Sequence, residues 1–153
     1  MKKLILLLFI PIVSFGQTYD ELLTISSEDT FQKVFIENDY EFYEERSDVI
    51  RYAFNLTKSY STTNPDLPPI VSAEIWVDYF KTNKIFSFNF SKDANAKKAV
   101  TMFAELKKSI KSNCDYRNVS EGTVIYKCTE SQIDIAAFKS ENGRGYVQMR
   151  IRQ

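Results

Sequence analysis

Alternating apolar and polar residues predict a β-hairpin over residues 71–80 and 84–91. Alternation places every second side chain on the same face of a strand, and a two-residue turn at Thr82-Asn83 fixes which residues lie opposite each other. Every opposed pair on one face is then apolar, as expected for a sheet face that packs on a core. The pairs are Tyr79 with Phe86, Val77 with Phe88 and Ile75 with Phe90.

A hairpin is also predicted at the end of the chain, because Asn142-Gly143 is a strong turn signal. Centring this hairpin on Gly143 puts one apolar set and one polar set on opposite faces. The apolar set is Ile135, Ala137, Val147, Met149 and Ile151, and the polar set is Asp134, Gln148, Arg150 and Arg152. The full set of other predicted strands is residues 40–43, 49–56, 114–119 and 123–128.

Two amphipathic helices are predicted from apolar residues at helical spacing. The first covers residues 28–38, with Ser27 as N-cap and acidic residues in its first turn. The second is longer and is capped by Asp93 or Ser91. Its apolar positions are Ala96, Ala99, Val100, Phe103, Leu106 and Ile110. Residues 58–69 contain three prolines and no periodicity, which predicts a loop.

The order of a helix followed by strands occurs twice, which suggests half-repeats over residues 17–91 and 92–153. Two unrelated units built from ordinary hairpins are the alternative interpretation. The first set of matching positions is Phe31, Tyr40 and Val49-Ile50 against Phe103, Tyr116 and Val124-Ile125. The second set is Ile75, Phe80 and Lys81 against Ile133, Phe138 and Lys139.

These elements predict one α+β domain over residues 17–153, with antiparallel strands and both helices packed on one sheet face. Each helix must bury its apolar stripe, and each sheet has one apolar face to receive it. The other sheet face is left in water. In layout the arrangement resembles tandem helix-plus-sheet modules such as the β-lactamase-inhibitor-like fold, and a similarity of layout implies little about function.

The first residues have the organisation of a secretory signal peptide. Basic Lys2 and Lys3 precede an apolar run from Leu4 to Ile10, and Ser14-Phe15-Gly16 supplies small residues at the positions that the peptidase requires. We therefore expect cleavage of residues 1–16 and export to the periplasm or the outside of the cell. The run is too short for a membrane span of about 20 residues, and no later run approaches that length. The ending resembles signal peptides of secreted flavobacterial proteins, a resemblance confined to this peptide.

The cysteine count predicts a single disulfide between Cys114 and Cys128. Export favours oxidation, and the two cysteines are equally distant from Glu121 at the centre of the predicted turn between 114–119 and 123–128. A redox-active pair is the less favoured alternative, because such pairs usually have the spacing Cys-x-x-Cys.

Composition excludes several kinds of chemistry. The chain has no histidine, which removes Ser-His-Asp and Cys-His nucleophilic sites and the commonest transition-metal ligand. Its few glycines form no phosphate-binding loop, so we expect neither a cofactor nor a metal. Loss of Lys2 and Lys3 leaves 18 basic residues of the original 20 against 20 acidic ones, a net charge of −2. This balance disfavours nucleic acid as a partner.

The face of the predicted sheet that points away from the helices is the leading candidate for a binding surface. It carries the only tryptophan, Trp76, beside charged residues where a solvated strand would have small polar ones. Aromatic and charged side chains together are typical of contacts with a protein or a glycan. The full set of candidates is Arg51, Glu74, Trp76, Asp78, Asn89, Gln148 and Arg150. The alternative for Trp76 is that the loop 58–69 covers it.

The sequence therefore favours a non-enzymatic, exported binding or accessory protein of the bacterial cell envelope. One alternative is a carboxylate-dependent hydrolase with its site beside the acidic segment 41–48. A structural subunit of a larger assembly is another. That alternative predicts self-association and an exposed apolar patch that includes Phe80 and Ile85.

Overall fold

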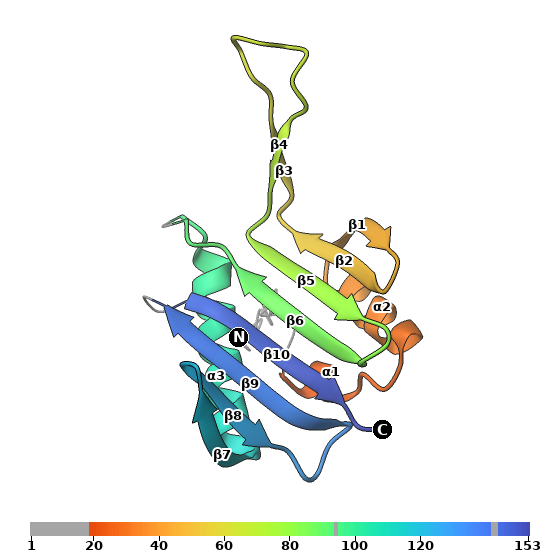
Figure 1. Ribbon diagram of the computed structural model, residues 1–153, viewed down its shortest axis with the longest axis vertical. Coiled ribbons are helices and arrows are strands. Elements are labelled where there is room, and N and C mark those ends of the chain that lie inside the picture. The colour runs from red at the N-terminus through yellow and green to blue at the C-terminus, as the bar shows by residue number, and fades with distance from the viewer. Residues whose placement is uncertain (1–18, 94, 142–143) are drawn as a thin grey trace, which may run out of the picture.

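A single antiparallel sheet of eight strands organises the molecule (Figure 1). The computed structural model describes residues 19–93, 95–141 and 144–153. In the first half the elements are α1 (Tyr19–Leu23), α2 (Glu28–Glu37), β1 (Glu41–Arg46), β2 (Val49–Phe54), β3 (Thr57–Ser59), β4 (Ile70–Ser72), β5 (Ile75–Phe80) and β6 (Ile85–Phe90). In the second half they are α3 (Lys97–Asn113), β7 (Asp115–Ser120), β8 (Thr123–Lys127), β9 (Ile133–Glu141) and β10 (Arg144–Ile151).

The strands lie in the order β1-β2-β5-β6-β10-β9-β8-β7, and each pairs antiparallel with its neighbours. Helices α2 and α3 lie behind the sheet in Figure 1, so the face toward the reader carries no described helix. The α+β class with helices on one face of an antiparallel sheet is confirmed. We call the uncovered side of the eight-stranded sheet the open face.

The core lies between the helices and the covered face of the sheet. It is rich in aromatic residues: Phe31 of α2 stacks on Tyr79 of β5 at 4.8 Å between ring centroids, and Phe103 of α3 meets Phe90 of β6 at 5.4 Å. Phe31 and Phe103 are at most 1% exposed. Each buried phenyl ring stabilises the fold by about 1.5–3 kcal/mol. These contacts hold α2 and α3 on the covered face of the sheet.

Helix α2 begins as predicted, with Ser27 as its N-cap. The Thr30 amide donates to Ser27 Oγ at 3.2 Å, while Thr30 Oγ1 accepts from the Ser27 amide at 2.9 Å. This reciprocal capping box satisfies two amides that the helix itself leaves unpaired. The apolar residues Phe31, Val34 and Phe35 are buried, in agreement with the predicted stripe.

The predicted caps of the second helix are wrong. Helix α3 has Ala96 at its N-cap position and no side-chain cap. Asp93 instead accepts from the Asn95 amide at 2.8 Å, in a turn that ends before the helix starts. The amide of Ala99 donates to Glu74 Oε1 at 2.9 Å, so a carboxylate from outside the helix satisfies this amide and complements the helix dipole.

Register confirms one predicted hairpin and corrects the other. Strands β5 and β6 pair as expected, with Tyr79 opposite Phe86 and Ile75 opposite Phe90. Strands β9 and β10 pair Met149 with Ala136 rather than with Ala137, the partner that a centre on Gly143 predicts. The full correction is that Ile135 and Ala137 lie on the open face while Ala136 and Phe138 lie in the core.

The error has a physical cause. Arg144 pairs with Glu141, whereas a centre on Gly143 would pair it with residue 142, so the partner of each residue shifts by one. The observed register buries the large Phe138 ring in place of the methyl group of Ala137, which removes more apolar area from water. A one-residue slip moves every side chain to the other face. Further along, β9 has one residue more than β10, because Asp134 lies between the partners of Arg150 and Ile151. This bulge shifts the register again, so Ile133 lies in the core opposite Ile151.

The two halves share one local irregularity. Strand β1 shifts register against β2 between Phe42 and Glu44, and β7 shifts against β8 between Tyr116 and Asn118. Each half thus has a helix, a bulged hairpin and two more sheet strands in the same order. The match of Phe80 with Phe138 is wrong, because Phe80 lies on the open face and Phe138 in the core.

The disulfide between Cys114 and Cys128 is confirmed, with a Cα–Cα distance of 4.3 Å. It joins the end of α3 to the end of β8. The bulge in β7 changes the register of the hairpin by one residue, which brings Cys114 opposite Cys128. Among the described residues there is no helix long and apolar enough to cross a membrane. The predicted signal peptide, residues 1–16, lies outside the described part of the chain.

Removal of the disulfide should destabilise the domain. Replacing both cysteines by serine (C114S with C128S) releases a loop with a sequence separation of 14 residues. In the chain-entropy account, opening this loop stabilises the unfolded state by about 3 kcal/mol. We expect the free energy of unfolding, measured with urea, to fall by about this amount. A double variant as stable as the parent under oxidising conditions would contradict the expectation.

Candidate binding face

Three rows of side chains cross the open face, with one residue from each strand that a row crosses. The middle row runs from β1 to β9 through Glu44, Arg51, Asp78, Ser87, Gln148 and Ala137. On one side lies a row with Ala53, Trp76, Asn89, Tyr146 and Lys139. On the other side lies a row with Val49, Phe80, Ile85, Arg150 and Ile135. The sheet register thus brings distant segments of the chain together.

Arg51 and Asp78 form an ion pair at the centre of the first half. Arg51 Nε donates to Asp78 Oδ1 at 2.5 Å and Arg51 Nη2 donates to Asp78 Oδ2 at 3.0 Å. The Asp78 side chain is only 9% exposed and that of Arg51 is 37% exposed. The hydrogen bonds to Asp78 raise the pKa of Arg51, against the opposing effect of burial. A bidentate pair of this kind fixes the plane of the guanidinium group.

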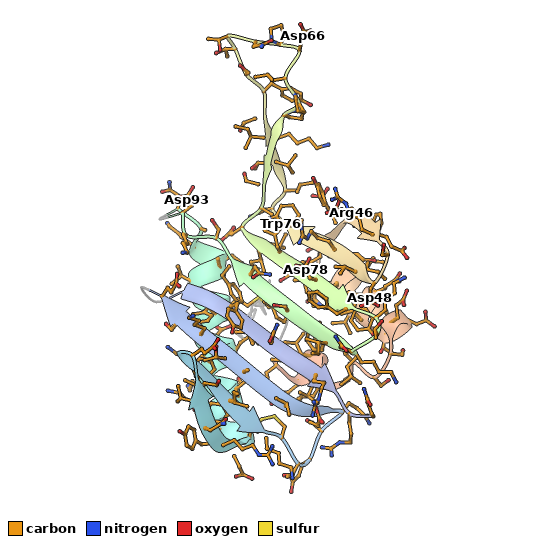
Figure 2. All side chains as sticks on the ribbon, viewed as in Figure 1. Arg46, Asp48, Asp66, Trp76, Asp78 and Asp93 are labelled. Carbon is orange, nitrogen blue, oxygen red and sulfur yellow. A yellow bond between two sulfur atoms is a disulfide. The ribbon has the colours of Figure 1, made fainter. Side chains whose placement is uncertain are left out.

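Trp76 packs beside this pair and is half-buried. Its ring lies 5.0 Å from that of Tyr43 in an edge-on arrangement, and the Arg51 guanidinium lies 5.5 Å from its centroid. The segment 58–69 does not cover Trp76, because it extends away from the sheet toward Asp66 (Figure 2). Alternation could not reveal the role of Tyr43, since Tyr43 is the extra residue of the β1 bulge.

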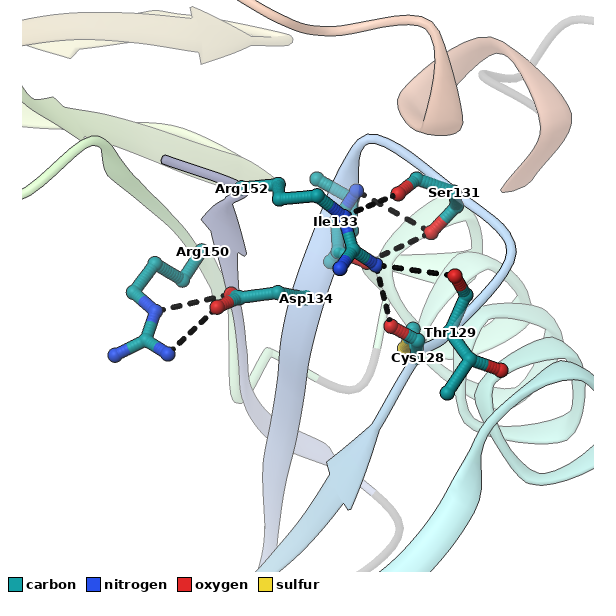
Figure 3. A network of polar contacts seen from close by, with 7 residues as sticks. All are labelled: Cys128, Thr129, Ser131, Ile133, Asp134, Arg150 and Arg152. Carbon is teal, nitrogen blue, oxygen red and sulfur yellow. Dashed lines mark hydrogen bonds and ion pairs between the residues drawn. The ribbon is translucent and has the colours of Figure 1, made fainter.

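A second ion pair lies in the other half, between Arg150 and Asp134 (Figure 3). Arg150 Nε donates to Asp134 Oδ1 at 2.9 Å and Arg150 Nη2 donates to Oδ2 at 2.7 Å. The hydrogen bonds from Arg150 lower the pKa of Asp134, and the charge of Arg152 adds to this effect. Arg152 itself donates to the carbonyl oxygens of Cys128, Thr129 and Ser131. The last residues of the chain are therefore held by directed contacts.

Apolar side chains lie on the open face beside both ion pairs. Phe80, Ile85 and Ile135 are half-buried and lie in one row with Arg150. The sheet face that points to solvent is usually polar, so this row departs from the ordinary pattern. Phe80 and Ile85, where a structural subunit would have an exposed apolar patch, are half-buried.

Six of the seven predicted site residues share the open face. The seventh, Glu74, forms hydrogen bonds to Asn55 and to the start of α3 instead. Its Oε2 accepts from Asn55 Nδ2 at 2.8 Å, and its Oε1 accepts from the amide of Ala99 in α3. Glu74 also lines a hollow of about 370 Å³ beside the start of α3. These bonds show that Glu74 holds the helix end, a role that only the tertiary structure reveals.

The acidic segment 41–48 is held by structural contacts. Glu44 pairs with Arg46 and Arg51, and Glu45 with Lys81. Asp48 Oδ1 accepts from the amide and the hydroxyl of Thr82 across the neighbouring turn. Within the described ranges no three acidic or cysteine side chains gather as a metal site would require.

Comparisons with models of known protein families, with curated proteins and with solved structures found no match for this chain. The layout similarity to tandem helix-plus-sheet modules therefore rests on the arrangement of elements alone.

Loss of the Arg51 charge should destabilise the fold, because it leaves the buried Asp78 carboxylate without its partner. We expect R51Q to lower the free energy of unfolding by about 2 kcal/mol, less than for a fully buried pair because Arg51 is partly exposed. The control is R46Q, which removes an 80% exposed arginine from Glu44 and should change stability by under about 0.5 kcal/mol. If urea unfolding gave equal losses of unfolding free energy for R51Q and R46Q, the stabilising role of the Arg51–Asp78 pair would be contradicted.

The Asp134 carboxyl should titrate below its ordinary pKa of about 3.9. Because the folded pKa is lowered, the stability from this pair is complete above the unfolded pKa and is lost as pH falls through the folded one. Carboxyl NMR titration measures the pKa directly. We expect a large upward shift in R150Q and a smaller one in R152Q, since Arg152 acts through charge alone. An unchanged pKa in R150Q would overturn the assignment.

Proposed function

We propose that this chain is an exported, non-enzymatic protein of the bacterial cell envelope that binds a protein or glycan partner through the open face. The observation that supports this proposal is the composition of a sheet face that no described helix covers. It combines Trp76 and Tyr43 with two oriented arginines, Arg51 and Arg150. Aromatic residues and arginine are the types enriched in protein interfaces.

The arrangement of the face suits a partner that covers a broad surface. Half-buried apolar residues lie beside the ion pairs, with Phe80 and Ile85 on one side of Arg150 and Ile135 on the other. Binding would complete the burial of Phe80, Ile85 and Ile135, and each square ångström of apolar area removed from water stabilises a complex by about 25 cal/mol. Both arginines are already held by a carboxylate, so less side-chain entropy is lost when a partner binds.

Two features favour a protein over a glycan as the partner. One is that Arg51 and Tyr43 already contact the Trp76 ring, which leaves less of it free to stack on a sugar. The other is the small size of the hollow beside Asn89 and Tyr146, about 200 Å³. Sites for small ligands usually measure about 300–1,000 Å³. A broad, shallow face with paired charges suits a folded protein better.

Two further observations support export. The predicted signal peptide directs the chain out of the cytoplasm, and the Cys114–Cys128 disulfide is of the kind that persists in oxidising compartments.

The proposal can be tested with residues 17–153 immobilised as bait for envelope and culture-supernatant fractions of the producing cells. The variant W76A with R150A removes one side chain from each half of the face and should abolish capture of a stoichiometric partner. A matched control, E105A with K108A, changes two exposed residues of α3 on the opposite side and should capture normally. Far-UV circular dichroism and thermal unfolding verify that each variant folds.

Retention of the same partner by folded W76A with R150A would show that the open face is not the binding surface. If all three proteins capture nothing at low and high salt, binding through this face is also contradicted. If capture depends on the face and periodate treatment of the fractions removes it, the partner is a glycan rather than a protein.

A further inference from the structure

The eight-stranded sheet has two edges, β1 on one side and β7 on the other, and no described strand pairs with the outer side of either (Figure 1). An edge strand presents backbone amide and carbonyl groups that can pair with a further strand. Seven antiparallel pairings separate β1 from β7, so the two strands run in opposite directions. When two copies stand side by side with their open faces on the same side, β7 of one copy is therefore antiparallel to β1 of the next.

The bulges of the two edge strands match each other. In β1 the bulge falls at Tyr43-Glu44, and in β7 it falls at Arg117-Asn118. A bulge usually protects an edge, because a regular strand cannot stay in register along it. Two edge strands that each have one extra residue at the same level can stay in register with each other. Each edge of this sheet thus fits the other edge better than it fits an ordinary strand.

Aligning the two bulges puts residues of the same sheet face opposite each other. On the covered side, Phe42 of one copy lies opposite Val119 of the other, and Glu45 lies opposite Tyr116. Phe42, Tyr116 and Val119 are 57%, 61% and 54% exposed, so the helices of the same copy leave them largely uncovered. Pairing of the edges removes part of this apolar area from water, which stabilises the contact.

On the open side, the same alignment brings opposite charges together. Glu44 meets Arg117, and Arg46 meets Asp115. Within the ranges that the structure describes, Arg117 and Asp115 are exposed and form no ion pair in their own copy. Pairing of β1 with a second β1 would join two strands that each carry three glutamates and one arginine. Pairing of β7 with a second β7 would set each Arg117 against an asparagine. Charge therefore favours β1 against β7.

The helices beside the two edges are also complementary in charge. In the side-by-side arrangement, α3 of one copy and α2 of the next lie on the same face of the joined sheet. Helix α3 carries five lysines and one glutamate, whereas α2 carries three acidic residues and one lysine. Opposite net charges attract across the junction and steer two copies into this order.

We propose that copies of this chain associate head to tail, with edge strand β7 of one copy paired with edge strand β1 of the next. Because the contact joins two different surfaces, each added copy offers an edge to a further one, and assembly does not stop at two copies. The open faces of successive copies lie side by side and stay uncovered. This inference does not depend on the proposed binding function, because the edges lie outside the open face.

The size of the contact predicts weak association. Each edge strand contributes six residues, fewer than the roughly 20–30 that each partner contributes to a standard stable interface. In sedimentation equilibrium of residues 17–153, we expect the average mass to rise with concentration between about 1 μM and 1 mM and to exceed that of two copies at the upper end. A chain that stays monomeric throughout would overturn the proposal.

Two variants that each block one edge test the head-to-tail arrangement. F42D places a carboxylate in the apolar contact of β1, and V119D does the same in β7. Each variant alone should associate with a Kd raised about a hundredfold, because every contact then buries an unpaired charge. A mixture of the two should form one-to-one dimers and nothing larger, since it contains one intact β7 edge and one intact β1 edge. Association of either variant alone as in the parent, or a mixture that stays monomeric, would contradict the arrangement.

The matched control for these variants is I70D, which places a carboxylate on an apolar side chain that is 75% exposed and distant from both edges. Ile70 belongs to the arm, which we define as the hairpin of residues 57–72 with strands β3 and β4. I70D should associate like the parent, and its failure to do so would show that F42D and V119D act through net charge alone. Far-UV circular dichroism and thermal unfolding verify that each variant folds.

Charge exchange tests the register of the two edges. R46E and D115R each place like charges opposite each other and should raise the Kd about fivefold at low salt. The double variant R46E with D115R restores opposite charges, because each contact takes one of the two positions from each copy. It should associate like the parent. Failure of the double variant to recover would exclude this register.

Discussion

The pairing of β6 with β10 is the contact on which the rest of the architecture depends. These strands end the first and second halves of the chain, and they pair antiparallel from Ile85 opposite Arg150 to Asn89 opposite Tyr146. The pairing merges two four-stranded meanders into one sheet. Both helices can then bury their apolar stripes on the same face, which leaves the opposite face uncovered along its full width.

That asymmetry decides where charged groups can lie. The covered face must be apolar, so the two halves fill it with aromatic rings such as Phe31, Phe88 and Phe103. Ionised side chains are excluded from it and lie on the open face, where Arg51 forms an ion pair with Asp78 and Arg150 forms one with Asp134. Each pair is bidentate, which holds it rigid although it lies beside solvent.

The two halves keep a common framework and differ in what is added to it. Both have a helix and a hairpin with a bulge at the matching position. The first half adds the arm and the carboxylate of Glu74, which reaches across to satisfy an amide of α3. The second half adds the disulfide that ties α3 to β8. The additions lie in loops and at element ends, where an insertion does not disturb the ladder.

By itself, the sequence determined those features that depend on local periodicity or on residue type. The β5–β6 register, the Ser27 cap and the pairing of Cys114 with Cys128 all follow from short-range patterns. Tertiary structure alone decided the β9–β10 register, because the preference for burying Phe138 over Ala137 depends on the helix packed above them. It also decided the neighbours of Trp76 and the role of Glu74, since a bulge and a contact between distant elements leave no periodic signal in the chain.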